Sequence, residues 1–292
     1  MSDYAIITDT ACDMPLAVAE KLGVTAVPLK ASIAGKDFDC KLSSLDIGSE
    51  GFYDVLRRGV VVKTAAPSID DYIRYFKKQL DRGLDILYIG FSTALSGAFN
   101  VGVIAAEELM GEYPDRKIIC VDSLCGSMGQ SLLVYRCVMR KKQGDTIEQV
   151  RDYAESIKGN ICHWFTPDDL HFLKRGGRIS ATAAAVGSVM NIKPVLKTDE
   201  SGKLKVVYKA RGRKFAIAKM VEQFSAHYRP DEEGDEMVFI THADCPDDAQ
   251  LLARSITKNC GVGNIMISEI GVALGAHCGP GTLALFYLGD ER

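Results

Sequence analysis

Three short segments rich in small hydroxyl side chains contain the residues best suited to hold an anion. Lys63–Ser68, Phe91–Ala98 and Val121–Gly129 each follow a run of residues that we expect to form a strand. Hydroxyl groups and unpaired helix N–H groups hydrogen-bond carboxylates and phosphates. Taken singly, each segment is explained by ordinary capping and turn formation, since Ser, Thr and Gly are common there. Together, the three segments predict a binding site for an anionic head group.

A single histidine in the second half of the chain is a further candidate for ligand contact. His277 lies within Ala273–Thr282, a run that we interpret as a loop with small residues around the imidazole. A lone histidine often has a structural hydrogen-bonding role. Because its neighbours are small, a ligand could also approach this imidazole closely.

Three cations surround two glycines in Lys174–Ser180. One interpretation is the end of a helix, where basic residues and glycine are both favoured. The other is a cationic rim beside a ligand site. The next run, Ala181–Met190, predicts a helix with side chains so small that a long, thin apolar ligand could lie against it. Close packing of another backbone explains the same pattern.

The motifs of common nucleotide, metal and acyl-transfer sites are absent from the sequence. No phosphate-binding Gly-rich motif leads into a helix, and the five histidines form no pair or Cys/His cluster at metal-ligand spacing. Gly90–Ala94 comes nearest to a hydrolase nucleophile elbow, but it has Ala where that turn needs its second Gly. The sequence therefore gives little support to an ATPase, a metalloenzyme or a hydrolase.

The elements that must position these residues differ between the two halves of the chain. In the first half, buried strands at Tyr4–Ile7, Asp85–Ile89 and Lys117–Val121 alternate with helical patterns, which predicts a parallel sheet covered on both faces. Loops at the carboxyl ends of such strands meet at one edge, so we expect the three hydroxyl-rich segments to converge there. The expected helices are Pro15–Leu22, Ile69–Leu80, Ser96–Met110 and Ser127–Lys142.

The second half predicts a mixed α+β unit. Thr166–Asp169 has the pattern of a helix start, and Asp199–Gly202 predicts a hairpin between strands Val195–Lys197 and Leu204–Tyr208. We expect a two-domain α/β protein, with a parallel α/β/α domain over residues 1–159 and a mixed α+β domain over residues 160–292. The remaining expected elements are helices Thr146–Lys158, Lys214–Tyr228 and Pro246–Lys258 and strands Asn160–Phe165, Met237–His242, Asn264–Ser268 and Leu283–Leu288.

Composition agrees with this organisation. The 292 residues exceed the size at which one hydrophobic core usually stops growing. A net charge of −3 provides no general attraction to nucleic acid or to an anionic membrane surface. Acids interrupt the first residues, where a secretion signal needs an apolar run, and the nine scattered cysteines form no Cys-x-x-Cys motif. These features predict a cytoplasmic protein with reduced thiols.

Six motifs, in order along nearly the whole chain, resemble those of the bacterial DegV family, which includes the fatty-acid-binding subunit of fatty acid kinase. The sequence departs from the family pattern at Ala65 and Ala66, which replace a hydroxyl residue and usually Gln, and at Cys278, where Thr is common. The motifs are Ile7–Pro15, Thr64–Ser68, Leu95–Gly97, Val121–Ser123, Phe165–Ser180 and His277–Gly281.

The resemblance implies a DegV-like fold with a tunnel, between and within the domains, for one long-chain fatty acid such as palmitate, stearate or oleate. By analogy, Thr64 and Ser96 would hydrogen-bond the carboxylate, and His277 would complete that contact. Arg211, or else Arg213, would lie at the tunnel entrance, where the kinase subunit docks. The expected ligand-binding residues are Thr64, Ala65, Ser96, Gly97, Ser127, Met128, Arg211, His277 and Gly279.

The function implied by the resemblance is that of a non-catalytic carrier, which presents its fatty acid to a partner kinase for conversion to an acyl phosphate in phospholipid synthesis. We expect no metal or other cofactor, transient membrane contact, and a monomer or weak dimer. Two alternatives remain open. One is an acyl-ester hydrolase or acyltransferase that uses Ser96 with His277. The other is a nucleic-acid-binding regulator, although basic residues cluster only at Lys174–Arg178 and Lys209–Lys214.

Overall fold

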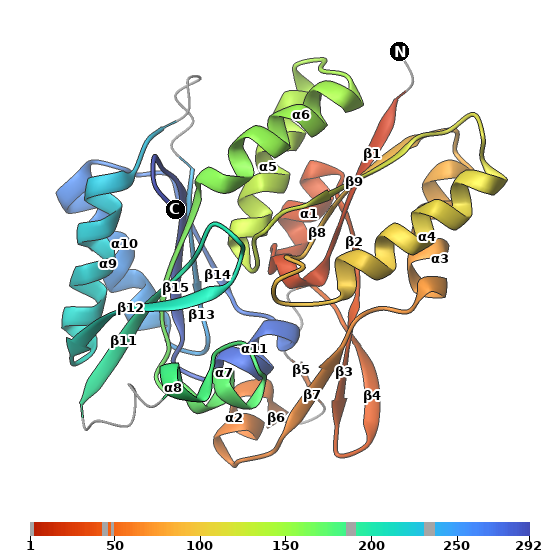
Figure 1. The fold of residues 1–292 in the computed structure, drawn as a ribbon. Coiled ribbons are helices and arrows are strands. Elements are labelled where there is room, and N and C mark those ends of the chain that lie inside the picture. Colours follow the sequence, from red (N-terminus) through yellow and green to blue (C-terminus); the bar gives the residue numbers. More distant parts are fainter. Residues whose placement is uncertain (1–2, 43–45, 48–49, 185–190, 231–236) are drawn as a thin grey trace.

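The computed structural model describes residues 3–42, 46–47, 50–184, 191–230 and 237–292. Two large sheets, each covered by helices, form two lobes that lie side by side (Figure 1). We call residues 3–160 the N-lobe and residues 161–292 the C-lobe. This arrangement confirms the predicted α/β class with two structural units, while the domain boundary near residue 159 stays a prediction.

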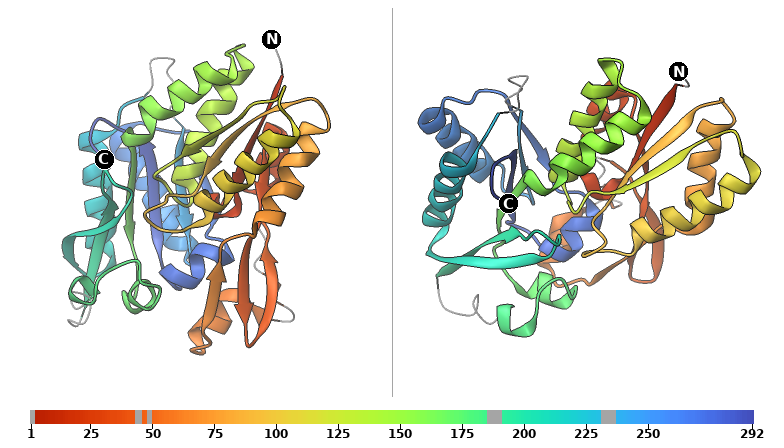
Figure 2. Two further views of the ribbon diagram at one scale, coloured as in Figure 1. Left: turned by 45° about the vertical axis from the view of Figure 1, so that its right-hand side comes forward. Right: turned by 45° about the horizontal axis from the view of Figure 1, so that its top comes forward.

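The N-lobe is built on a parallel sheet of four strands in the order β2-β1-β8-β9. All six residues of β8 are buried, as expected for a central parallel strand covered on both faces. Helices α3 and α4 pack on one face of the sheet, and α5 and α6 pack on the other (Figures 1 and 2). The elements are β1 (Tyr4–Asp9), the 3-10 turn η1 (Thr10–Cys12), α1 (Leu16–Leu22), β2 (Thr25–Val27), α3 (Ile69–Leu80), β8 (Asp85–Gly90), α4 (Ala98–Glu112), β9 (Ile118–Asp122), α5 (Met128–Lys142), α6 (Ile147–Ile157) and the 3-10 turn η2 (Lys158–Asn160).

A small antiparallel sheet, in the order β4-β3-β7, extends from the N-lobe and was not predicted. It contains Thr64, which pairs with Ala31, so the first hydroxyl-rich segment does not leave the parallel sheet as we expected. Ala34 and Gly35 both have positive φ, which is typical of the tight turn that joins two antiparallel strands. The elements are β3 (Leu29–Ile33), β4 (Lys36–Cys40), β5 (Asp46–Ile47), β6 (Glu50–Gly51), α2 (Phe52–Arg57) and β7 (Val62–Ala65).

The C-lobe contains a mixed sheet of six strands in the order β12-β11-β10-β15-β13-β14. Side chains of β10 alternate between its faces: Cys162 and Trp164 pack beneath α9 and α10, whereas Phe165 faces the N-lobe. The predicted hairpin is present as β11 and β12. The elements are β10 (Ile161–Thr166), α7 (His171–Arg175), α8 (Ala181–Ala184), β11 (Ile192–Thr198), β12 (Leu204–Arg211), α9 (Arg213–His227), β13 (Val238–His242), α10 (Pro246–Cys260), β14 (Ile265–Glu269), α11 (Val272–Cys278) and β15 (Leu283–Leu288).

Two elements of the C-lobe differ from the prediction. Helix α7 begins at His171 rather than near Pro167, because Asp168 is held by Lys193 and Asp169 accepts a hydrogen bond from the amide of His171. The segment before Gly279, which we expected to be a loop, is helix α11, with His277 in its last turn. Of the predicted small-residue helix, α8 is present, and residues 185–190 lie outside the described residues.

Candidate ligand-binding site

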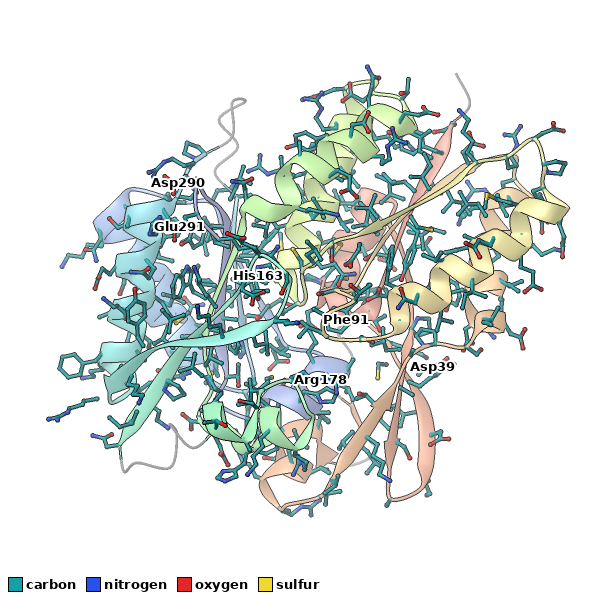
Figure 3. All side chains as sticks on the ribbon, viewed as in Figure 1. Asp39, Phe91, His163, Arg178, Asp290 and Glu291 are labelled. Atoms are coloured by element: carbon teal, nitrogen blue, oxygen red, sulfur yellow. The ribbon has the colours of Figure 1, made fainter. Side chains whose placement is uncertain are left out.

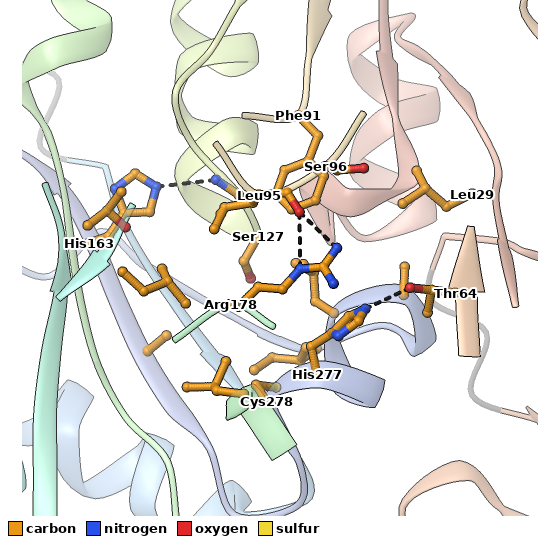
Figure 4. A pocket seen from close by; sticks show the side chains of 18 of the residues that line it. Leu29, Thr64, Phe91, Leu95, Ser96, Ser127, His163, Arg178, His277 and Cys278 are labelled. Atoms are coloured by element: carbon orange, nitrogen blue, oxygen red, sulfur yellow. Dashed lines mark hydrogen bonds between the residues drawn. The ribbon is translucent and has the colours of Figure 1, made fainter. Parts of the chain in front are cut away.

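A largely apolar cavity of about 260 Å³ is lined by residues of both lobes (Figure 4). From the N-lobe it takes Leu29, Thr64, Ala65, Ala66, Phe91, Leu95, Ser96, Gly97, Gly126 and Ser127. From the C-lobe it takes His163, Phe165, Leu173, Arg178, Thr198, Leu204, Ile270, Ala273, Leu274, His277, Cys278, Thr282, Ala284 and Phe286. The C-lobe sheet, α11, the small antiparallel sheet and the segments that follow β8 and β9 therefore build the cavity jointly.

A hydrogen bond across the two lobes marks the polar end of this cavity. The Thr64 Oγ1 atom, on β7, lies 2.6 Å from the Nε2 atom of His277, on α11 (Figure 4). Burial, with the nearby Arg178 and Arg175 guanidinium groups, lowers the pKa of His277 to about 4. The imidazole is therefore neutral at pH 7 and can exchange hydrogen bonds with an anion without carrying charge itself.

The other ring nitrogen of His277 lies against Gly176. A Cβ atom added at Gly176 would come within 2.2 Å of His277 Nδ1. Glycine is required at this position because any side chain would displace the imidazole. The Gly-Gly pair in the basic segment thus permits close packing beside the site, in addition to ending α7.

Ser96 supplies a hydroxyl group from the segment between β8 and α4. Its Oγ accepts a hydrogen bond from the amide of Ala98 at 3.2 Å, and in the described part of the chain its own hydrogen has no acceptor. Gly97 is the N-cap of α4, so the first amides of that helix lie next to Ser96. This end of the cavity therefore offers neutral donors to an oxyanion.

Arg178 provides the cationic group of the site. Its side chain lies between the two lobes (Figure 3). Its Nε and Nη2 atoms donate to the carbonyl oxygen of Leu95 at 3.1 and 2.8 Å (Figure 4), and Nη1 donates to the carbonyl oxygen of Gly176. Burial lowers the pKa of the guanidinium, although an arginine in a protein keeps its proton. Arg178 therefore ties the C-lobe turn to the N-lobe segment that carries Ser96, and it places a positive charge beside His277.

The remaining wall of the cavity is mainly hydrocarbon. Phe165, Leu204 and Phe286 line it, and the ring of His163 packs edge-on against Phe286 with centroids 5.2 Å apart. His163 Nδ1 lies 2.9 Å from the carbonyl oxygen of Ile161, and burial holds its pKa well below the ordinary value. His163 is thus a neutral side chain, and this part of the wall suits an apolar chain.

The structure brings most of the expected ligand-binding residues to this cavity. Thr64, Ala65, Ser96, Gly97, Ser127 and His277 all line it.

The other three expected residues do not line the cavity. Met128 is fully buried in the core, and Gly279 lies against the ring of Phe172. Arg211 is exposed at the end of the edge strand β12, where it lines a separate surface hollow with Phe215.

The alternative to Arg211 also lies away from the cavity. Arg213 binds the carboxylate of Asp248 at 2.8 Å and the carbonyl oxygen of Thr166 at 2.9 Å. Among the described residues, the arginine of the cavity is instead Arg178, which comes from the segment considered as a cationic rim. No motif in the sequence indicated Leu29, His163 or Thr198.

The geometry of a hydrolase is not present around His277. Its Nε2 atom contacts Thr64 rather than Ser96, and its Nδ1 atom faces a glycine. A Ser-His-acid triad needs the serine on one ring nitrogen and a carboxylate on the other.

Within the described ranges, three or more His, Cys, Asp or Glu side chains nowhere gather into a group that could hold a metal ion.

In the part of the chain that the structure describes, no helix is long and apolar enough to cross a membrane. All nine cysteines are free thiols.

Comparison with known proteins places the chain among relatives of nearly equal length. The model of the DegV family, described as an uncharacterised protein family, matches residues 3–290. A DegV domain-containing protein of Clostridium perfringens is 38% identical over 292 residues, which cover 100% of this chain and 99% of the relative.

Solved structures show the same fold. A DegV family protein of Thermus thermophilus, whose structure is described in terms of fatty acid binding, is 26% identical with a TM-score of 0.84, over 99% of this chain and 100% of that chain. The Fatty Acid Kinase (Fak) B3 protein of Streptococcus pneumoniae, loaded with linoleic acid, is 24% identical with a TM-score of 0.84, over 99% and 100% of the two chains.

Proposed function

Because the chain belongs to the DegV family, we propose that it binds one long-chain fatty acid in the cavity between its lobes. The observation that carries the proposal is the arrangement of this cavity. Thr64, Ser96, His277 and Arg178 line a cavity whose wall is otherwise mainly apolar. The fatty acid binding described for the Thermus thermophilus protein supports the same assignment.

Burial of the acyl chain would dominate the affinity. Each buried methylene contributes about 0.8 kcal/mol, so roughly fifteen methylenes supply on the order of 12 kcal/mol before entropic costs are subtracted. Aromatic and aliphatic side chains such as Phe91, Leu173 and Phe286 provide the apolar wall.

The head group requires partners, because a buried carboxylate without hydrogen bonds is strongly destabilised. Ser96 can donate its hydroxyl hydrogen. Thr64 and His277 share one hydrogen in the bond between them, so that bond must open for both the Thr64 hydroxyl and the neutral imidazole N–H to donate to the carboxylate. Arg178 would balance the charge from nearby, since its donors already hold two backbone carbonyl groups. The same donors would accept an acyl phosphate, which presents a similar set of oxygens.

We propose further that the chain is a carrier and that a separate kinase phosphorylates its ligand. The sequence has no phosphate-binding Gly-rich motif, so nucleotide and metal would come from the partner. A surface groove shares Leu95, Arg178 and Leu204 with the cavity and is bordered by Lys203, Lys205 and Lys209. This groove lies on the side of the polar cluster and suits the approach of an acidic or phosphate-bearing partner site.

Native mass spectrometry of gently purified protein tests the binding function. We expect a bound species with the mass of one long-chain fatty acid and its displacement by a fluorescent fatty acid. Thr64→Val should lose at least about tenfold in affinity, the cost of a hydrogen bond to a charged group. Thr257→Val, on the exposed side of α10, is the matched control and should bind normally. A ligand-free protein that takes up no fatty acid would contradict the proposal.

Incubation with a fatty acid kinase catalytic subunit, ATP and Mg²⁺ tests the carrier function separately. We expect acyl phosphate only when both proteins are present, and none from this chain alone. Acyl-ester hydrolysis by the purified chain that disappears in Ser96→Ala would favour the hydrolase instead.

A further inference from the structure

Asp13 is a buried carboxylate at the junction of the two lobes. Its side chain accepts a hydrogen bond from Ser127 Oγ at 2.6 Å and another from the amide of Gly271 at 2.9 Å. Ser127 belongs to the N-lobe and lines the ligand cavity, whereas Gly271 is the N-cap of α11 in the C-lobe. One carboxylate thus joins a cavity-lining side chain to the start of the helix that carries His277.

The backbone at this junction is held in a conformation that non-glycine residues rarely adopt. Asp13 and Ser127, the two residues joined by the shorter hydrogen bond, both have a φ of 52°. Such backbone persists only where the surrounding contacts enforce it, and it is common at ligand sites. The junction is also tightly packed at Gly271, because a Cβ atom there would lie 2.9 Å from Asp13 Oδ1.

In the described part of the chain, three hydrogen bonds join the segment from Ile270 to His277 to the N-lobe. Tyr53 Oη donates to the carbonyl oxygen of Ile270 at 2.5 Å, Asp13 holds the next amide, and Thr64 contacts His277. Of these three anchors, Asp13 is the one that also binds a side chain of the cavity wall, Ser127.

The bond to Asp13 determines what Ser127 can offer a ligand. An ionised carboxylate only accepts hydrogen bonds, so Ser127 must donate its single hydroxyl hydrogen to Asp13. Its oxygen lies 3.2 Å from Thr241 Oγ1, a hydroxyl that can donate to it. While Asp13 is ionised, Ser127 therefore has no hydrogen left for a fatty-acid carboxylate, which leaves Thr64, Ser96 and His277 as the head-group donors.

We propose that Asp13 is a positioning residue of the ligand site, which orients the Ser127 hydroxyl and anchors α11 so that His277 stays beside Thr64. As regards the ligand, this inference rests on the proposed function. The part of the inference that concerns the position of α11 rests only on the hydrogen bonds of Asp13.

The ionisation of Asp13 makes its hydrogen bonds depend on pH, and a purely structural contact would show no such pH dependence. The ionisable groups that interact with it are Cys12 on its own turn, Cys40 on β4, Tyr53 on α2 and Cys278 on α11, and burial raises the pKa of all four, so that they stay neutral. Burial likewise raises the pKa of Asp13 to about 7. Its hydrogen bonds should therefore strengthen as the carboxyl group ionises across neutral pH.

The test compares Asp13→Asn and Asp13→Ala with Asp85→Asn, which changes another buried carboxylate, at the start of β8 in the N-lobe. In the wild-type protein and in Asp85→Asn, we expect the amide proton shift of Gly271 to titrate between pH 6 and 8. We also expect the dissociation of a fluorescent fatty acid to slow several-fold over that range. Asp13→Asn should abolish both pH dependences while the protein remains folded.

Asp13→Ala loses both hydrogen bonds, so we expect at least tenfold faster ligand dissociation and lower hydrogen-exchange protection along α11. An Asp13→Asn variant that keeps the wild-type titration of Gly271 would overturn the inference. This comparison remains decisive even if Asp13→Ala fails to fold. The Gly271 titration needs no ligand. A protein that binds no fatty acid but shows this titration would contradict the proposed function and leave the role of Asp13 supported.

Discussion

Single side chains account for the chemistry of the head-group end. The neutral imidazole of His277, the Thr64 hydroxyl and the Ser96 hydroxyl are donors, and Arg178 carries the positive charge. A neutral donor set holds an anion without the desolvation penalty of bringing a second buried charge into contact with it. This division of roles leads to two predictions.

Replacing His277 should weaken binding without changing its pH dependence. We expect His277→Ala to reduce fatty-acid affinity roughly 10- to 100-fold, as for the loss of a hydrogen bond to a charged group. Because the pKa of His277 is lowered to about 4, the imidazole does not titrate between pH 5 and 8. Binding titrations of both proteins over this range should therefore give parallel profiles. A step near pH 6.5 that vanishes in His277→Ala would contradict this.

A methyl group at position 176 should displace the imidazole. Gly176→Ala would place its Cβ atom within 2.2 Å of His277 Nδ1. We expect an affinity loss similar to that of His277→Ala, and overpacking that costs about 1–3 kcal/mol of stability. Calorimetry and ligand displacement measure the two effects. Gly111→Ala, where the new Cβ atom meets open space, is the control. It should leave the affinity unchanged and cause no loss of stability, since alanine is favoured over glycine within a helix such as α4.

At the level of secondary-structure elements, the site depends on how α11 and the segment before α4 are held. Helix α11 belongs to the C-lobe chain but packs on β3, β7 and η1 of the N-lobe. The segment before α4 is held from the opposite direction, by Arg178 of the C-lobe. Each lobe therefore positions ligand-binding groups of the other.

The segment before α4 should loosen when Arg178 is replaced by lysine. An ammonium group cannot reproduce the planar set of bonds to Leu95 and Gly176. We expect Arg178→Lys to speed ligand dissociation about tenfold, as measured by stopped-flow displacement. The neighbouring Arg175, which stacks on Phe172 at 4.7 Å, supplies the control. If Arg175→Lys and Arg178→Lys behave alike, the anchoring role of Arg178 is refuted.

For the protein as a whole, the site lies where two separately built sheets meet. The molecule also buries two carboxyl groups, Asp9 at the end of β1 within the N-lobe and Asp13 at the junction of the lobes. Asp9 accepts hydrogen bonds from the amides of Phe91 and Ala11, and Asp13 accepts those from Ser127 and Gly271. Burial raises the pKa of both carboxyl groups, to about 6 and about 7.

The two buried carboxyl groups should make stability fall as pH rises. Both pKa values are higher in the folded chain than in the unfolded chain, where aspartate titrates near 3.9. The folded state then binds more protons between pH 4 and 7, so its free energy of unfolding decreases over that range. Urea unfolding at several pH values should show a shallower decrease in Asp9→Asn and Asp13→Asn than in the wild type. Equal slopes in all three proteins would disprove this linkage.

Local sequence patterns were sufficient for three of the four strands of the N-lobe parallel sheet, for the helices that cover it and for part of the site. The predicted strand Asp85–Ile89 lies within β8, which is buried along its whole length, and its nearly unbroken apolar run indicated that burial. Ser68 ends a hydroxyl-rich segment for which capping was one explanation, and it does form a capping box with Asp71. The family motifs indicated Thr64, Ser96 and His277, which the structure brings to one cavity.

Contacts between distant segments account for what the patterns did not show. Helix α11 begins within a glycine-rich run, where Asp13, 258 residues away, accepts a hydrogen bond from the amide of its N-cap, Gly271. Arg178 lies at the cavity because its guanidinium group donates to the carbonyl oxygen of Leu95. Arg211 lies on the edge strand β12, where it is exposed to solvent. Secondary structure follows from short-range periodicity, so the chain sequence indicated it. The walls of a cavity between two sheets follow from how those sheets pack, and this depends on long-range contacts that no local pattern encodes.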